Sequence, residues 1–108
     1  MAGCLFCTRI AVAARGSGAA VALAFPDAFP VSDGHMLVVA RRHIERLETL
    51  PADEWAGLFA LVHRICREVA AQPGVDGLNV GINSGEAAGQ TIAHAHVHVI
   101  PPAPRRRY

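Results

Sequence analysis

Residues 93–100 read Ala-His-Ala-His-Val-His-Val-Ile, so three histidines alternate with small or apolar residues. Successive side chains of a β-strand point to opposite faces, and the alternation therefore predicts a strand with His94, His96 and His98 on one face. A helix would scatter the three imidazoles, and the β-branched residues also favour a strand. Such a row is more typical of a metal site, or of a catalytic surface for a phosphorylated substrate, than of a polar strand face.

The composition excludes several classes of protein. With 108 residues, 52% of them hydrophobic, and a formal net charge of +1, the chain is typical of one soluble globular domain. This charge creates no field that favours nucleic acid or a membrane as a partner. The absence of lysine excludes Schiff-base chemistry and a lysine-containing phosphate loop. A domain of this size buries only about two thirds of its unfolded surface, so we expect a homodimer.

The cysteines and the first residues of the chain predict a cytoplasmic protein. No charged segment followed by a long apolar one opens the sequence, and no run approaches the ~18 apolar residues that span a bilayer. Cys4, Cys7 and Cys66 form an odd set, which a secreted disulfide scaffold rarely has. Cys66 falls on a predicted helix, where we interpret it as a buried apolar residue.

The hydrophobic pattern predicts an α+β domain in which a few antiparallel strands pack on one long helix. Apolar residues recur every three or four positions between Pro51 and Ala71, as in an amphipathic helix, and Pro73-Gly74 ends the pattern. A short helix or turn is expected over Cys4–Val12. The remaining regular segments are predicted strands: Ala20–Phe25, His35–Ala40, Leu78–Asn83 and Ile92–Ile100.

The loop at residues 83–91 leads directly into the histidine strand. Its backbone amides, that of Gly89 among them, and the side chains of Asn83, Gln90 and Thr91 are neutral groups suited to phosphate oxygens. A loop of this composition would by itself usually be a plain hairpin turn. Its position beside three histidines favours a role in phosphate binding.

Cys4 and Cys7 form a CxxC pair, which predicts half of a zinc site. His43 and His94 are candidates for the other two ligands. A site of this kind would tie the N-terminal segment to the sheet and leave His96 and His98 for catalysis. A reduced pair without metal is the alternative, whereas a redox pair fits poorly because no strand precedes the motif.

These motifs resemble the histidine triad (HIT) superfamily of nucleotide hydrolases and transferases. Its signature, His-φ-His-φ-His-φ-φ with φ apolar, is met by residues 94–100. The other matching segments follow in the same order along nearly the whole chain: CLFC at 4–7, Phe25-Pro26-Asp27, Gly34-His35, Arg42-His43, the long helix, Asn83 and Ala88–Thr91. The resemblance implies a HIT-like fold over residues 1–101, with an antiparallel sheet of about five strands, one long helix and a short N-terminal helix. Residues 102–108, with Arg105, Arg106 and Arg107, would form a basic tail.

The resemblance also implies roles for single residues. His96 would be the nucleophile, and His98 would contact the phosphate with it. His35 matches a histidine near the phosphate, Asp27 matches the acidic residue that holds the ribose hydroxyls, and Phe25 would line the base pocket. Zinc-containing bacterial relatives use ligands that correspond to Cys4, Cys7, His43 and His94. A homodimer is implied, in which the sheets of two protomers join.

The predicted function is a hydrolase that releases a nucleoside monophosphate, AMP or GMP, through a nucleotidyl-histidine intermediate. A purine nucleoside phosphoramidase-like enzyme and a dinucleoside polyphosphate hydrolase both fit the sequence. The alternative from another class is a nucleotide-binding regulatory module that does little chemistry. An intact triad argues against such a module, because a binding protein needs no nucleophile.

Overall fold

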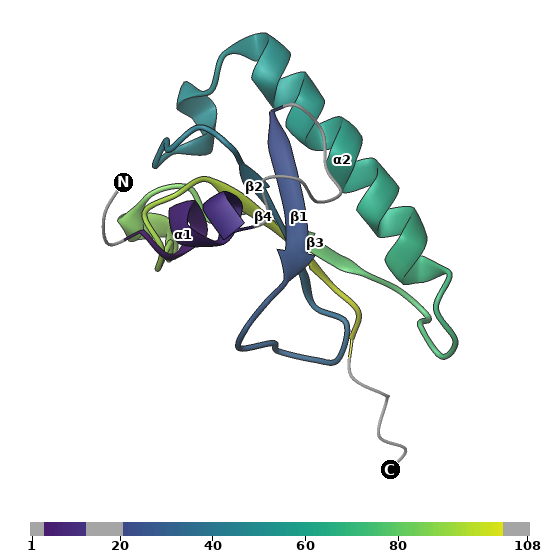
Figure 1. Ribbon diagram of the computed structural model, residues 1–108. Coiled ribbons are helices and arrows are strands. Elements are labelled where there is room, and N and C mark those ends of the chain that lie inside the picture. The colour runs from purple at the N-terminus through teal and green to yellow at the C-terminus, as the bar shows by residue number, and fades with distance from the viewer. Residues whose placement is uncertain (1–3, 13–20, 103–108) are drawn as a thin grey trace.

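The computed structural model describes residues 4–12 and 21–102 of the chain. Its central feature is a four-stranded sheet of β1 (Ala22–Pro26), β2 (Met36–Ala40), β3 (Asn79–Gly81) and β4 (His96–Ile100). The strands follow the order β1-β2-β4-β3, and each neighbouring pair is antiparallel (Figure 1). The predicted α+β class is confirmed, with four strands over the described residues. The predicted arginine tail, Arg105 to Arg107, lies outside those residues.

The long helix α2 (Ala52–Ala70) covers one face of the sheet (Figure 1). Pro51 occupies the N-cap position, and Asp53 and Glu54 occupy the first turn, where carboxylates are favoured by the helix dipole. Gly74, with a positive φ of 81°, accommodates the turn that follows the helix. The larger core cluster combines buried residues of α2, residues of β1, β2 and β4 that face it, and three residues outside these elements: Ala22, Val38, Ala40, Leu58, Leu61, Val62, Ile65, Val69, Val97 and Val99, with Leu47, Leu50 and Ala95.

The second apolar cluster lies on the opposite face of the sheet. Because side chains alternate along a strand, the remaining residues of β1 and β2 point away from α2. They pack with Phe6 of the short helix α1 (Leu5–Val12), and the cluster consists of Phe6, Leu23, Phe25, Leu37 and Val39. His96 and His98 alternate with Val97 and Val99 on β4, so the two histidines face the side that carries α1.

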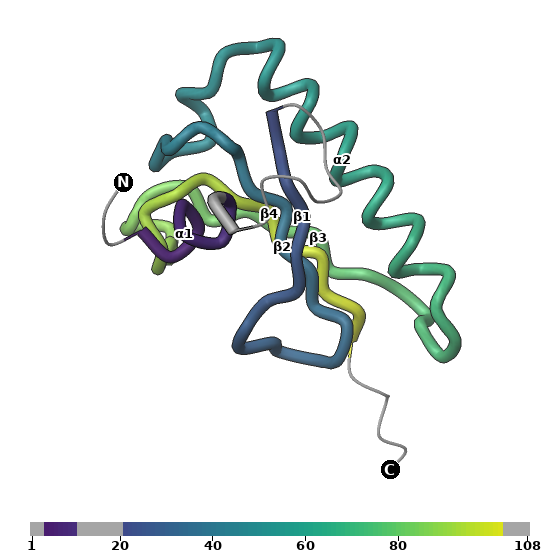
Figure 2. Tube along the Cα trace, in the orientation of Figure 1, coloured from purple at the N-terminus to yellow at the C-terminus, as the bar shows by residue number. Residues whose placement is uncertain are grey.

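The histidine strand is shorter than the sequence predicts. Residues 92–94 form a bend, and β4 begins only at His96. His94 therefore lies before the strand. The bend is held beside the end of β2, because the Ala40 N–H donates to the Ala95 carbonyl at 3.2 Å and the Ala95 N–H donates to the Ile44 carbonyl at 2.7 Å. The N-terminal helix lies next to this bend (Figure 2).

The third strand is also shorter than predicted, since β3 covers only the residues that pair with His98, Val99 and Ile100. It lies at an edge of the sheet and is exposed along its whole length. No described helix has the length and apolar character needed to cross a membrane. The cytoplasmic location stays a prediction.

Candidate functional site

The centre of the candidate site consists of His96 and His98 on β4. Their ring centroids lie 4.9 Å apart with nearly perpendicular planes. His96 is buried, whereas His98 is half-buried. The Phe6 ring packs edge-on against His96 with centroids 5.0 Å apart, so α1 forms one wall beside this imidazole.

The hydrogen bonds define which nitrogen of His96 is free. Its Nδ1 lies 2.7 Å from the His94 carbonyl oxygen. A carbonyl can only accept, so Nδ1 carries the hydrogen and Nε2 keeps its lone pair. The short bond also fixes the orientation of the ring. This arrangement presents Nε2 of a neutral imidazole as a nucleophile.

A second set of contacts joins His98 to His35 and Asp27. The Val31 N–H donates to Nδ1 of His35 at 3.1 Å, so the hydrogen of the neutral His35 ring is on Nε2. That Nε2 lies 3.2 Å from Nδ1 of His98 and 3.4 Å from Oδ2 of Asp27. Two N–H groups cannot face each other at this distance, so His98 accepts through Nδ1 and carries its hydrogen on Nε2. His98 is thereby prepared to donate to a phosphate oxygen.

Asp27, His35 and His98 are close enough to surround a metal ion. The positions of the hydrogens on the two histidines argue against a metal there. A histidine ligand must direct a lone pair at the metal. The lone pair of His35 is already engaged by the Val31 amide, and its Nε2 carries hydrogen. We therefore interpret these three side chains as a hydrogen-bonded chain.

The surroundings keep both strand histidines uncharged near neutral pH. Burial lowers the pKa of His96, and the hydrogen bond to the His94 carbonyl and the charge of Asp27 oppose the effect only in part. Burial also lowers the pKa of His98, as do the neighbouring His96 and His35. A lowered pKa favours the neutral imidazole, which is the form that can attack phosphorus.

An apolar pocket of about 240 Å³ has Phe6 in its wall, and the Phe6 ring separates it from His96. Phe25 and Asp27, to which the family resemblance gives contacts with a nucleoside, both line it. The Phe6 and Phe25 rings meet edge-on, with centroids 5.7 Å apart. Helix α1 and the loop after β1 complete the lining with Leu5, Thr8, Arg9, Ala28, Phe29, Leu37 and Ile92. The size and apolar character of the pocket suit one heterocyclic base.

The four predicted zinc ligands lie together on the other side of Phe6. One ligand atom from each of Cys4, Cys7, His43 and His94 lies within 4.8 Å of the others. The Cys4 and Cys7 sulfurs are 3.4 and 3.6 Å from Nδ1 of His94, and Cys7 Sγ is 3.1 Å from Nδ1 of His43. The S···N edges of a tetrahedral zinc site measure about 3.5 Å, given Zn–S of about 2.3 Å and Zn–N of about 2.0 Å. The residues therefore fit zinc in both chemistry and spacing.

The protein orients these ligands before any metal binds. Nε2 of the fully buried His94 donates to the Ala40 carbonyl at 2.5 Å, which leaves Nδ1 free to face the cysteines. Burial also lowers the pKa of His94, as a neutral ligand requires. Burial and the neighbouring Cys4 raise the pKa of Cys7, an effect that a cation between the two sulfurs would reverse. Beside His43, Arg42 pairs with Glu54 of α2 at 2.6 Å and anchors this segment.

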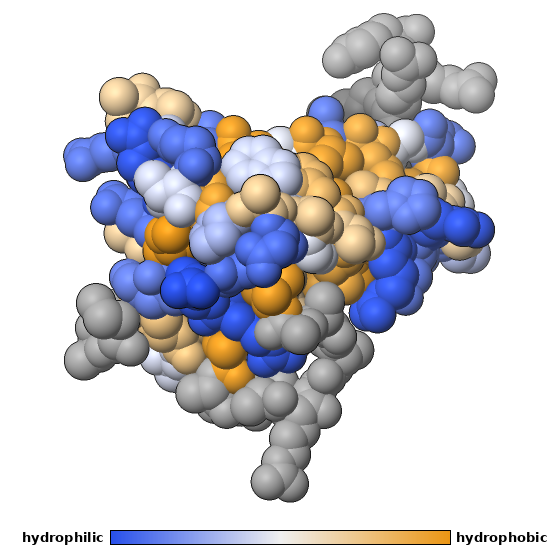
Figure 3. Space-filling view, turned by 90° about the horizontal axis from the view of Figure 1, so that it is seen from above, coloured by the Kyte–Doolittle hydropathy of each residue, from blue (hydrophilic) through white to orange (hydrophobic). Residues whose placement is uncertain are grey.

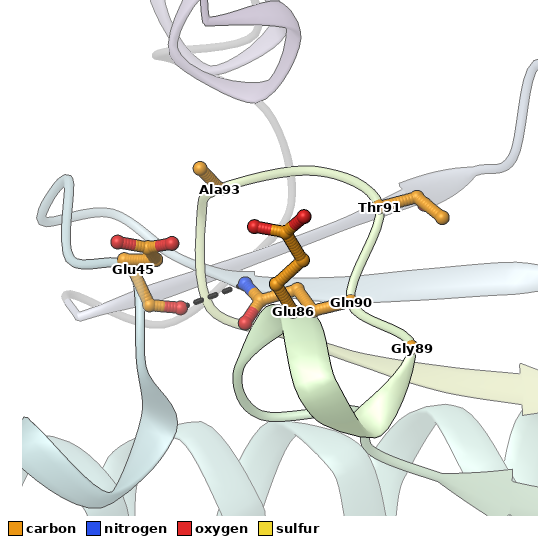
Figure 4. A pocket seen from close by; sticks show the side chains of 6 residues that line it. All are labelled: Glu45, Glu86, Gly89, Gln90, Thr91 and Ala93. Carbon is orange, nitrogen blue, oxygen red and sulfur yellow. Dashed lines mark hydrogen bonds between the residues drawn. The ribbon is translucent and has the colours of Figure 1, made fainter.

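The 83–91 loop is arranged differently from the sequence-based hypothesis. Gln90 uses its amide to brace the loop: Oε1 accepts from the Gly85 N–H, and Nε2 donates to the Glu45 and Ile92 carbonyls. Figure 4 shows the Gln90 amide directed at Glu45, while Thr91 points away. Asn83 donates to the Ala88 carbonyl at 2.7 Å. These bonds occupy both Gln90 donors, so a phosphate contact by this side chain would require the brace to open.

Gly89 and the exposed Thr91 line a separate hollow on this loop (Figure 4). Gly89 has a positive φ of 93°, a conformation that favours glycine and ends the short helical turn of residues 86–88. The loop is thus a braced support for the bend that carries His94. The backbone amides of Gly85, Ala88, Gly89 and Gln90 also donate within the loop, so the predicted phosphate contact by the Gly89 amide would likewise require these bonds to open.

Two residues of the site escape the sequence-based assignment, Phe6 and Arg9. Phe6 stands between the cysteines of the CLFC motif, and Arg9 follows it three positions later, which places both on one side of a helix. This spacing is the one indication in the sequence that the two side chains act together. It does not identify them as site residues, because only the folded chain brings α1 against Phe25 and His96.

Comparisons with known proteins agree with the fold and with the histidine motif. The HIT domain family matches residues 19–105, and the chain belongs to this family. An uncharacterised HIT-like protein of Mycobacterium tuberculosis is 37% identical over 106 residues, which covers 92% of this chain and 71% of that protein. The bis(5'-nucleosyl)-tetraphosphatase of Schizosaccharomyces pombe is 37% identical over 78 residues, 72% of this chain and 43% of the yeast protein.

One of the similar solved structures is that of a protein described as zinc-bound. The Zn-bound histidine triad family protein from Mycobacterium smegmatis is 33% identical to this chain, with a TM-score of 0.77. The match covers 94% of this chain and 76% of that protein. Within this family, the four clustered ligands of the present chain are a candidate zinc centre.

Proposed function

We propose that the protein is a hydrolase that releases a nucleoside monophosphate from a substituted α-phosphate. The observation that carries the proposal is the lone pair on Nε2 of His96, held beside an N–H donor on His98 and next to a base-sized apolar pocket. The site thus offers a nucleophile for the phosphorus, a hydrogen-bond donor for the phosphate oxygens and a pocket for the nucleoside. A phosphate held by His98 would keep the α-phosphorus in front of His96.

The reaction proceeds in two displacements. In the first, Nε2 of His96 attacks phosphorus, the N–P bond forms, and the bond to the leaving group breaks; the leaving group departs with a proton from solvent. In the second, water attacks the phosphorus of the nucleotidyl-histidine, the N–P bond breaks and its electron pair returns to Nε2 of His96. The hydroxyl of the water stays on phosphorus, and its remaining proton balances the one consumed by the leaving group. His98 stabilises the charge on the phosphate oxygens by donating from Nε2, and donors of the 83–91 loop would add to this only once its internal hydrogen bonds open. Asp27 binds the ribose hydroxyls, and Phe25 contacts the base.

The leaving group separates two versions of the proposal. We favour a phosphoramidase-like activity on a P–N or P–O bond, and the alternative is cleavage of dinucleoside polyphosphates, the activity in the name of the S. pombe relative. Turnover of adenosine phosphoramidate should be compared with that of diadenosine polyphosphates. The polyphosphates as the faster substrates would favour the alternative. Binding of AMP without turnover of either class would favour a regulatory module.

Zinc would have a structural role in this protein. Cys4, Cys7, His43 and His94 would hold it, and four protein ligands leave no open position for substrate. Bound there, the ion would supply a cross-link between α1 and the sheet. The chemical step rests on the imidazoles alone.

We also propose a homodimer that joins two sheets through β3. This strand lies at the sheet edge, and an edge strand with free backbone groups can pair with a second copy. Val80 and Ile82 are 49% and 38% exposed, and Trp55 of α2 is 39% exposed. On the face seen from above, apolar side chains reach the surface between polar ones (Figure 3). Pairing of two copies through β3 would cover exposed apolar side chains such as those of Val80 and Ile82.

The nucleophile is tested by His96→Ala. We expect turnover to fall by several orders of magnitude while the affinity for AMP stays within about tenfold, because a nucleophile contributes mainly to the transition state. His98→Ala should be less severe. The exposed His63 on α2 is the matched control, and His63→Ala should leave turnover unchanged. A nucleotidyl group trapped on His94 or His98, or more than a tenth of the activity in His96→Ala, would contradict the assignment.

A further inference from the structure

Among the described residues that line the apolar pocket, one is a cation, Arg9 in the last turn of α1. Its guanidinium carbon lies 4.3 Å from the centroid of the Phe25 ring. The side chain is half-buried, and the stacking on an aromatic face holds it on the pocket wall. Arg9 is therefore part of the surface that a bound base would meet.

The donors of Arg9 have no acceptor within residues 4–12 and 21–102. Three other arginines, Arg42, Arg46 and Arg64, each reach a carboxylate. Arg9 makes only the ring contact, although its planar head carries five N–H groups. Stacking engages the face of the guanidinium and leaves the donors at its edge available. A ligand with two adjacent acceptors would satisfy them.

The position of Arg9 indicates which part of a nucleotide it would meet. The Phe6 ring contacts His96 on one side, with centroids 5.0 Å apart, and Phe25 on another, at 5.7 Å. Arg9 stacks on Phe25, so two aromatic rings separate it from the nucleophile. A phosphate at His96 and a ribose at Asp27 would place the base, and not the phosphate, beside Arg9.

We propose that Arg9 selects purine bases that carry a carbonyl at C6, guanine and hypoxanthine, over adenine. This inference rests on the proposed nucleotide site. Guanine presents O6 and N7 as two adjacent acceptors, which match the paired donors of a guanidinium. Adenine presents an amino group in place of O6, so one donor of Arg9 would face another donor. The preferred substrates are thus derivatives of GMP or IMP.

The test measures the dissociation constants of GMP, IMP and AMP for the full chain by isothermal titration calorimetry. We expect GMP and IMP to bind about tenfold more tightly than AMP, as for a bidentate arginine contact of moderate strength. Arg9→Leu should remove the difference. Arg9→Gln should shift the preference toward AMP, because a carboxamide can pair with N6 and N7 of adenine. The matched control is Arg64→Leu on α2, which should keep the preference of the unchanged protein.

The outcomes separate this inference from the proposed function. If none of the three nucleotides binds the unchanged protein, the nucleotide site itself is wrong. If AMP binds as tightly as GMP, or if the preference survives Arg9→Leu, the role of Arg9 is refuted while the hydrolase proposal stands. Tight binding of GMP alone, with IMP equal to AMP, would also refute it, because the 2-amino group would then be the feature recognised.

Discussion

Substitution of Phe6 by leucine should affect both stability and catalysis. The Phe6 side chain is 4% exposed, and its ring meets Phe25, His94 and His96 edge-on. The aromatic pair with Phe25 is worth about 0.5–1.5 kcal/mol. The smaller leucine also leaves a cavity, so we expect the free energy of unfolding to fall by about 2 kcal/mol. For a domain of this size, that loss lowers the Tm by roughly 8–16 °C.

The catalytic effect comes from the lost wall beside His96. A misplaced nucleophile lowers the rate even when it is chemically intact, so we expect kcat/KM to fall about tenfold in Phe6→Leu. Thermal unfolding followed by circular dichroism and steady-state kinetics measure the two effects. Leu23→Val is the matched control: Leu23 belongs to the same apolar cluster, and the substitution should cost about 1 kcal/mol with kcat/KM nearly unchanged. Equal kinetic losses in the two variants would refute a specific role for the Phe6 ring.

Two further predictions concern the metal and the assembly. Elemental analysis of protein purified without a metal-affinity tag should find about one zinc per chain, and Cys4→Ala should lower the Tm more than the catalytic rate. Zinc well below one equivalent would reject the site. Light scattering at micromolar concentration should show a dimer, and Val80→Glu at the exposed edge strand should produce a monomer. A monomeric unchanged protein would contradict the proposed interface.

The fold was largely predictable because its signals are local. The spacing of apolar residues between Pro51 and Ala71 corresponds to α2, which is one residue shorter at each end. Turn-forming residues before an apolar run predict β2, which is buried on both faces, whereas two-residue alternation predicts the later part of β4. The bend at residues 92–94 could not be predicted from alternation. It depends on hydrogen bonds to the distant Ala40 and Ile44.

The candidate site also combines residues with local sequence signals and residues whose role depends on tertiary contacts. The histidines and cysteines are recognisable because few other roles require their spacing. The side chain of Gln90 gives no such indication, since the same amide could bind a phosphate or brace its own loop. The hydrogen bond from Gln90 to the Glu45 carbonyl spans 45 positions of the chain, and it shows that this amide braces the loop. The stacking of Arg9 on Phe25 is likewise a product of tertiary packing.

Helix α1 connects the metal centre, the nucleophile and the base pocket. It has only eight residues, and a helix this short is not stable in water by itself, so tertiary contacts must hold it. Cys4 begins it as a cap, because its Sγ accepts the Cys7 N–H at 3.4 Å. Zinc at Cys4 and Cys7 would fix the same turn that directs Phe6 toward His96 and Arg9 toward Phe25. Loss of the metal should therefore weaken nucleotide binding through the pocket wall, while the His94 carbonyl that orients His96 stays in place because backbone hydrogen bonds of Ala95 to Ala40 and Ile44 hold the bend.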